Sequence, residues 1–168
     1  MATVTHFLRP ESAHFDPDLA EPQYRTQNGT NMSVVTLNFD ATTKEQCFFV
    51  LRATRYGSGN LTLRFLWGGR TASTGDVIWG ASLAATTPNT DATPLSSKTF
   101  ATEQTVTDSH LGTNNERIHE ATLTLSNLDS IVAGDYLVLK VTRDAANASD
   151  TMAGDAILFG VVVEWSDV

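Results

Sequence analysis

The chain has 168 residues, of which 41% are hydrophobic, and its net charge is −8 at pH 7. A chain of this length can bury the core of one domain. The acidic charge argues against a nucleic-acid partner, because phosphate backbones are bound by lysine and arginine. The single cysteine, Cys47, excludes an internal disulfide framework and is expected to be a buried thiol. The sequence contains no apolar run long enough to span a membrane and no leader peptide at its start, so we expect assembly in cytoplasm and no membrane partner.

The first 32 residues differ in pattern from the rest. They contain Pro10, Pro17 and Pro22 and show no sustained period of two or 3.6 residues. We expect an extended N-terminal arm over residues 1–32 that lies along a surface, either the protein's own or a partner's. The alternative is a frayed terminus. The apolar residues of the arm that we expect to bind a partner are Phe7, Leu8, Phe15 and Tyr24.

Residues 33–168 show the alternation of apolar and polar side chains that is typical of β-strands, with Gly, Asn, Asp and Pro at the breaks. The last two strands are the most apolar, which favours positions inside their sheets. The pattern predicts strands near residues 35–39, 46–54, 60–67, 77–85, 99–107, 118–125, 136–141 and 157–165.

Eight strands of this kind predict an all-β domain, an antiparallel two-sheet sandwich of the jelly-roll type. In that topology the eighth strand lies between the first and the third, and the seventh lies between the second and the fourth. The main alternative is a seven-stranded immunoglobulin-like sandwich with one extra strand.

A long loop is expected over residues 86–98, which contain two prolines and only one large apolar residue. Long loops on a rigid scaffold often contact partners. The residues of this loop that we expect at such a contact are Pro88, Pro94 and Leu95.

The sequence carries no familiar catalytic motif, whether a phosphate loop, a G-x-S-x-G elbow, an H-E-x-x-H helix or a cysteine pair. The four histidines lack metal-ligand spacing. Asp108, Ser109 and His110 are sequence neighbours and cannot converge as a triad, so a polar turn is expected there. His119 is expected to be exposed to solvent or at an interface. We therefore predict no enzyme, no catalytic residues and no cofactor.

Three tryptophans, Trp67, Trp79 and Trp165, could form a sugar-stacking platform. Each of them, however, falls on the apolar phase of its strand. This phase favours core packing over an exposed platform.

The connection over residues 143–155 contains hard oxygen ligands of the kind that calcium selects. Their spacing differs from that of an EF-hand loop, so calcium is the weaker interpretation. The stronger one is structural: Asp and Asn cap a wide turn, and Arg143 forms an ion pair with a nearby carboxylate that holds the loop. The calcium candidates are Asp144, Asn147, Asp150 and Asp155.

Two runs, GDVIWGASLAA at 75–85 and AGDYLVLKVTRDAANASDTMAGDAILFGVVVEW at 133–165, resemble small β-sandwich virion proteins of tailed bacteriophages. The shared features are a G-D-x-x-W strand, a GD-x-L-x-L-x-x-x-RDA strand and a D-x-x-x-GDA-x-L strand. The resemblance covers residues 33–168 and leaves out the arm. These motifs reflect strand and turn chemistry, so they indicate the fold more specifically than the function of the protein.

The resemblance implies a non-enzymatic structural protein of the virion, assembled in the host cytoplasm. The first expectation is a capsid decoration or cement protein, commonly a trimer, that binds the major capsid protein and stabilises the shell. The alternative is a receptor- or glycan-binding module of a fibre or tail, which would require an exposed aromatic patch.

Overall fold

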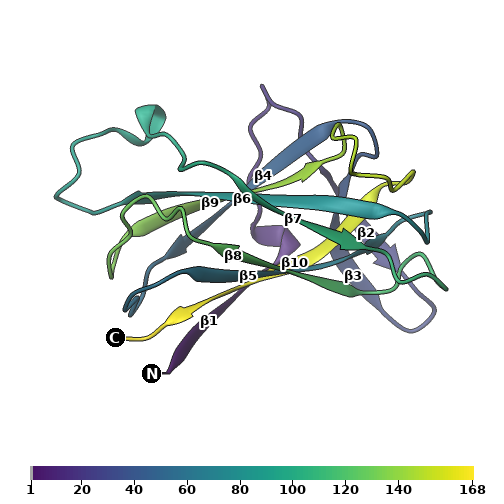
Figure 1. Cartoon of the computed structure of the whole chain (residues 1–168), viewed down its shortest axis with the longest axis horizontal. Coiled ribbons are helices and arrows are strands. Elements are labelled where there is room, and N and C mark those ends of the chain that lie inside the picture. Colours follow the sequence, from purple (N-terminus) through teal and green to yellow (C-terminus); the bar gives the residue numbers. More distant parts are fainter. Residues whose placement is uncertain (1) are drawn as a thin grey trace.

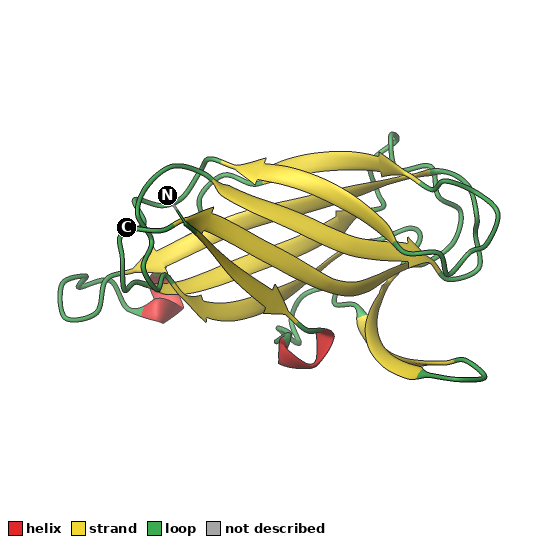
Figure 2. Ribbon diagram, turned by 90° about the horizontal axis from the view of Figure 1, so that it is seen from below, coloured by secondary structure: helices red, strands yellow, loops and turns green. Residues whose placement is uncertain are grey.

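The structure, a computed structural model, describes residues 2–168 and consists of two antiparallel β-sheets packed face to face (Figure 1, Figure 2). Two short 3-10 turns, η1 (Pro10–Ser12) and η2 (Leu95–Ser97), lie in connections between strands. No helix within residues 2–168 is long and apolar enough to cross a membrane. The strands are β1 (Thr3–Leu8), β2 (Gln23–Asn28), β3 (Ser33–Phe39), β4 (Lys44–Arg52), β5 (Leu61–Gly69), β6 (Asp76–Thr86), β7 (Gln104–Ser109), β8 (His119–Leu125), β9 (Tyr136–Asp144) and β10 (Ala156–Ser166).

The sheet order is that of a jelly roll. The large sheet has the order β2-β3-β10-β5-β8, with β1 also paired to β10, and the small sheet has the order β4-β9-β6-β7. Strand β10 lies between β3 and β5, and β9 lies between β4 and β6, as the hydrophobic pattern predicts. The predicted count of eight strands is wrong, because residues 3–8 and 23–28, inside the predicted arm, form two further strands.

Strand β10 changes its partner on one edge. It pairs with β3 through Ala156–Leu158 and with β1 through Val161–Ser166, while β5 runs along its other edge. A register shift between Leu158 and Gly160 marks the change. Gly160 has a φ of +154°, and a Cβ at this position would collide with the ring of Phe7. Only glycine therefore fits where β1 meets β10.

The core between the sheets is built around a cluster of aromatic rings. Trp79 is fully buried; its ring centroid lies 5.7 Å from that of Phe65 and 5.2 Å from that of Phe39. Trp67 and Trp165 are also buried, which confirms the expectation of core packing for all three tryptophans. Cys47 is buried as predicted. Its burial raises the pKa of the thiol, so it is not a nucleophile at neutral pH.

The segment between β1 and β2 crosses from the large sheet to the edge of the small sheet. His14 and Phe48 exchange two backbone hydrogen bonds, of 2.7 and 2.9 Å, and the Gln46 amide donates to the carbonyl of Ala20. The predicted arm thus lies on the protein's own sheets over these residues. It covers the edge of β4, which would otherwise offer unpaired backbone groups to another chain.

Candidate functional site: an apolar groove on the large sheet

A groove of about 570 Å³ opens on the outer face of the large sheet. Segments that are far apart in the sequence contribute to it: the end of β1, η1, the start of β3, and single residues of β5, β10 and the loop before β8. Its lining residues are Phe7, Arg9, Pro10, Glu11, Met32, Ser33, Val34, Val35, Leu66, Ile118 and Phe159.

The floor of the groove consists of Leu66 from β5 and Phe159 from β10. Each follows a buried core residue, Phe65 or Leu158, so strand alternation turns its side chain to the opposite face. Apolar side chains at these positions make both faces of the sheet apolar here. The floor is therefore a partly exposed apolar surface.

Two walls stand beside this floor. Phe7, 50% exposed, forms one wall together with η1, where Pro10 occupies a position at the start of the turn that suits its fixed φ. The other wall is Met32, just before β3, together with the start of β3; Met32 and Val34 are 71% and 41% exposed. This wall belongs to the β2–β3 hairpin, which curves away from the two sheets (Figure 2).

Side-chain hydrogen bonds hold the hairpin in its curved position. Arg70 donates to Oε1 of Gln27 over 2.9 Å, and Nε2 of Gln27 donates to Glu116 over 2.6 Å. At the base of the hairpin the Tyr24 hydroxyl donates to the carbonyl of Ala13. The wall is thus tied both to β1 through η1 and to the loop over residues 110–118, hereafter the 110–118 loop.

Charged groups lie at the rim of the groove. Arg9 and Glu11 are exposed, and within residues 2–168 neither forms an ion pair. No histidine or cysteine is among the lining residues, and Glu11 is the only carboxylate among them. The groove can therefore bind a ligand through apolar contact and a few polar groups, but its lining lacks the paired groups of general acid–base catalysis.

The residues predicted to bind a partner lie at separate places. Phe7 lines the groove, whereas its neighbour Leu8 is 7% exposed and belongs to the core. Phe15 packs against Tyr24, with ring centroids 4.8 Å apart. Leu95, 57% exposed, lines a hollow of about 140 Å³ on the outer face of the small sheet. The remaining predicted residues are Pro88 and Pro94, both exposed.

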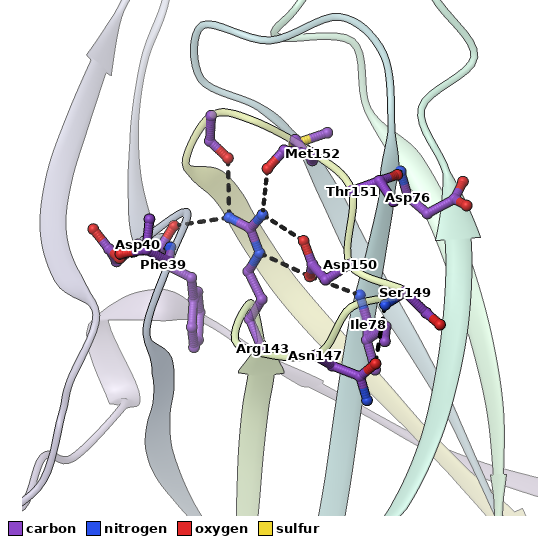
Figure 3. Close-up of polar contacts among 12 residues, drawn as sticks. Phe39, Asp40, Asp76, Ile78, Arg143, Asn147, Ser149, Asp150, Thr151 and Met152 are labelled. Atoms are coloured by element: carbon purple, nitrogen blue, oxygen red, sulfur yellow. Dashed lines mark hydrogen bonds and ion pairs between the residues drawn. The ribbon is translucent and has the colours of Figure 1, made fainter.

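A buried ion pair joins the end of β9 to the connection between β9 and β10, residues 145–155 (Figure 3). Arg143 and Asp150 are 2.8 Å apart, and both side chains are inaccessible to solvent. The guanidinium also donates to three backbone carbonyls, and Asp150 accepts a further bond from the Ile78 amide. The predicted ion pair of Arg143 is therefore present, with Asp150 as its partner.

The other calcium candidates face different partners. Asp144 lies 3.5 Å from Lys44, and Asn147 accepts a bond from the Ser149 amide. The carbonyl of Asp155 accepts from the Arg70 amide. Among residues 2–168, no three His, Cys, Asp or Glu side chains are grouped in a way that could hold a metal ion.

Most of the groove lies outside the residues that sequence reasoning selected. Leu66 could have been found from one signal: it is a large apolar residue on the phase of its strand that carries Arg64. Phe159 could not, because in the sequence it shares the phase of Val161 and Trp165, and the register shift between Leu158 and Gly160 breaks that alternation. Met32, Val34 and Ile118 carry no such signal, because they border loops where no period exists to mark their faces.

No family model and no curated protein sequence matches this chain. A solved carbohydrate-binding module, CBM28, described as specific for non-crystalline cellulose, aligns over 93% of this chain and 89% of its own with a TM-score of 0.54 and 10% identity. CBM35 from Cellvibrio japonicus Abf62 aligns over 98% and 99% with a TM-score of 0.47 and 13% identity. The C-terminal CBM6 of LamC from Zobellia galactanivorans aligns over 96% and 98% with a TM-score of 0.45 and 10% identity. At such identities the first likeness shows a shared sandwich fold.

Proposed function

We propose that this protein is a non-enzymatic glycan-binding module that takes a carbohydrate into the groove of the large sheet. The observation that carries the proposal is the presence of two aromatic rings, Phe7 and Phe159, in one groove of about 570 Å³. Sugar rings offer an apolar C–H face that packs on aromatic side chains. Their hydroxyl groups would bind Arg9 and Glu11 at the rim.

The fold supports this proposal in a limited way. The CBM28 module with the shared sandwich fold is described as binding non-crystalline cellulose. A fold alone does not define a function, so the aromatic lining of the groove is the stronger support. The buried tryptophans play no part in it, since they are in the core.

The proposal is tested with Phe7→Ala and Phe159→Ala in affinity electrophoresis and calorimetry against a panel of soluble polysaccharides. Each change should weaken the binding of the recognised glycan about tenfold, equivalent to about 1.4 kcal/mol. The matched control is Tyr136→Ala, which removes an aromatic ring 36% exposed on the small sheet. Its affinity should equal that of the unchanged protein.

Two outcomes contradict the glycan proposal. One is the absence of binding to every glycan of the panel by the folded protein. The other is equal affinity in all three variants, which would move the binding site away from the groove. Thermal unfolding of each variant shows whether the sandwich is intact.

A second candidate function is a virion decoration protein, as the bacteriophage resemblance suggests. It is favoured by the apolar exposure at the groove, where Met32 and Ile118 are 71% and 60% exposed, because exposed apolar surface of this kind often marks a protein partner. Under this proposal the groove binds the major capsid protein and the module is a trimer. Co-sedimentation with expanded, undecorated capsids, together with the oligomer mass, tests it. Saturable binding that Met32→Ser abolishes would favour this candidate over the first.

A further inference from the structure

His119, the first residue of β8, is buried in the sandwich. It is 5% exposed, so the expectation of solvent exposure is wrong. The reason is strand phase: His119 shares the inward phase of β8 with Ala121 and Leu123. Both nitrogens of its ring are buried and, within residues 2–168, have no hydrogen-bond partner. A buried imidazole without partners is stable only in its neutral form.

A second histidine packs against this ring. The ring centroids of His110 and His119 lie 4.3 Å apart at an angle of 72°, and that of Trp67 lies 5.0 Å from that of His119. The Nδ1 atom of His110 accepts from the Gly112 amide, and its Nε2 atom lies 3.0 Å from the carbonyl of Asn115. With Nδ1 as acceptor, Nε2 carries the proton and donates it to that carbonyl.

The bonds of His110 connect the histidine pair to the groove. The carbonyl of Asn115, which His110 binds, also accepts from the Gly69 amide of β5. One residue further on, Glu116 binds Gln27 of the hairpin wall, and Ile118 lines the groove itself. The 110–118 loop therefore links the histidine pair to the wall that Met32–Val35 form.

Few other titratable groups face His119. Asp108 accepts a bond of 2.7 Å from the Trp67 indole, and Arg117 lies two residues before His119. Burial lowers the pKa of His119, and the neighbouring His110 and Arg117 act in the same direction, whereas Asp108 opposes them. The imidazole is therefore kept neutral in the folded protein at a pH where an exposed histidine begins to charge.

We propose that the His110–His119 pair is a pH switch: it holds the 110–118 loop in place at neutral pH and releases this loop, with the groove wall, when His119 is protonated. A positive charge on the His119 ring, whose centroid lies 4.3 Å from that of His110, would be buried without a partner, and moving the loop outward is the way to hydrate it. The switch itself stands on the loop's contacts. Its effect on ligand binding rests on the proposed function of the groove.

The direction of the pH effect follows from linkage. The pKa of His119 is lower in the folded state than its ordinary value of 6.5, so the unfolded or opened state binds the proton first. The stabilisation by the neutral imidazole is complete above about pH 6.5. It is lost as the pH falls from there towards the lowered folded pKa.

Hydrogen exchange of the 110–118 amides at pH 7.5 and pH 5.5, corrected for the intrinsic pH dependence of exchange, tests the switch. Acidification should speed exchange in this loop about tenfold and leave β9 unchanged. His119→Phe keeps an aromatic ring in the core and cannot take up a proton, so its loop should exchange equally at both values. The matched control, His14→Phe, changes an exposed histidine and should behave as the unchanged protein.

If His119→Phe does not fold, a direct titration of His119 in the unchanged protein tests the switch. The His119 ring signal, followed by NMR in the unchanged protein, should titrate with a midpoint below 6.5; a midpoint at or above this value overturns the switch. Equal acid sensitivity of loop exchange in a folded His119→Phe variant also overturns the switch.

Glycan affinity should fall over the same pH range. Loop release without any change in glycan affinity would refute the glycan site in the groove and leave the switch standing.

Discussion

Two neighbouring loops each cover a buried ionisable side chain, but one of these side chains is charged and paired, and the other is neutral and without a hydrogen-bond partner. Both lie at the end of the sandwich away from the two termini (Figure 1). Asp150 of the 145–155 loop pairs with Arg143 of β9; both side chains are inaccessible, and each is surrounded by hydrogen-bond partners. In the 110–118 loop, His110 is hydrogen-bonded, whereas the buried nitrogens of His119 have no partner within residues 2–168.

The difference shows when a buried group can keep its charge. An arginine stays protonated in any folded protein, so it is tolerated inside only if its N–H groups find acceptors. A histidine can lose its charge and is tolerated as an apolar ring. We therefore expect the 145–155 loop to stay in place at any pH that preserves the fold. The 110–118 loop stays in place only while His119 is neutral.

The largest expected effect on the free energy of unfolding comes from breaking the Arg143–Asp150 ion pair. Arg143→Met leaves the Asp150 carboxylate buried without its counter-charge and should lower the free energy of unfolding by about 3–5 kcal/mol. Urea unfolding at pH 7 measures the change. Arg25→Met is the matched control, because Arg25 is exposed on β2 and its side chain binds only Gln23 among residues 2–168; its effect should stay within about 0.5 kcal/mol. A loss below 1 kcal/mol in Arg143→Met would show that partners other than Arg143 satisfy Asp150.

A double variant separates the loss of attraction between Arg143 and Asp150 from the cost of leaving the Asp150 carboxylate buried without a counter-charge. Arg143→Met combined with Asp150→Leu removes both charges, and should be more stable than Arg143→Met alone by about 2 kcal/mol. Full recovery is not expected, since the Ile78 amide loses its acceptor. The same urea experiment gives the comparison. A double variant less stable than the single one would mean that the pair stabilises the fold by more than charge compensation.

A smaller effect is expected from the second loop. Asn115→Ala removes the side-chain hydrogen bond to the carbonyl of Arg70 and should lower the free energy of unfolding by about 1 kcal/mol. Its exchange at pH 7.5 should approach that of the unchanged protein at pH 5.5, because both conditions loosen the 110–118 loop. Unchanged exchange would show that the other contacts of this loop hold it without the Asn115 side chain.

The smallest effect comes from a carboxyl beside the ion pair. Burial raises the pKa of Glu45 to about 7; the charges of Asp40 and Asp155 act in the same direction, whereas the hydrogen bond from the Asp40 amide and the charge of Arg143 oppose it. Because the folded pKa lies above the unfolded one, its stabilisation is complete below about pH 4.5 and is lost as the pH rises through 7. Glu45→Gln should therefore raise stability at pH 8 by about 0.5–1 kcal/mol, allowing for partial solvent screening, and by nothing at pH 4.5. An equal gain at both pH values would point to packing.

Much of the fold could be predicted from the two-residue alternation of apolar and polar side chains. The jelly-roll order follows from eight alternating segments, of which the two most apolar are β9 and β10. Strand β2 could not be found this way, because five of its six side chains are exposed and no face is apolar. Strand β1 carries a weak signal in Val4 and Leu8, which its proline-rich surroundings obscure. Strand β2 is specified by the backbone edge that it pairs with and not by a hydrophobic face, whereas β1 combines its pairing to β10 with the buried Leu8.

The groove was harder to predict than the ion pair for a physical reason. Arg143 and Asp150 are seven residues apart in one connection, so their meeting is local. Phe7, Met32 and Phe159 come together only because β10 exchanges β3 for β1 at Gly160. A contact that depends on the register of three strands has no counterpart in a local pattern.

The central place of β10 has a consequence for the order of assembly. Its edges receive β1, β3 and β5, yet the ribosome makes it after the other nine strands. Until then the large sheet can form only the β2–β3 and β5–β8 ladders, with their inner edges open to wrong partners. Closure joins segments more than a hundred residues apart, which makes the last step slow. We expect refolding in which β9 and its neighbours gain protection before β10, and a nascent chain that depends on chaperones until its final strand is released.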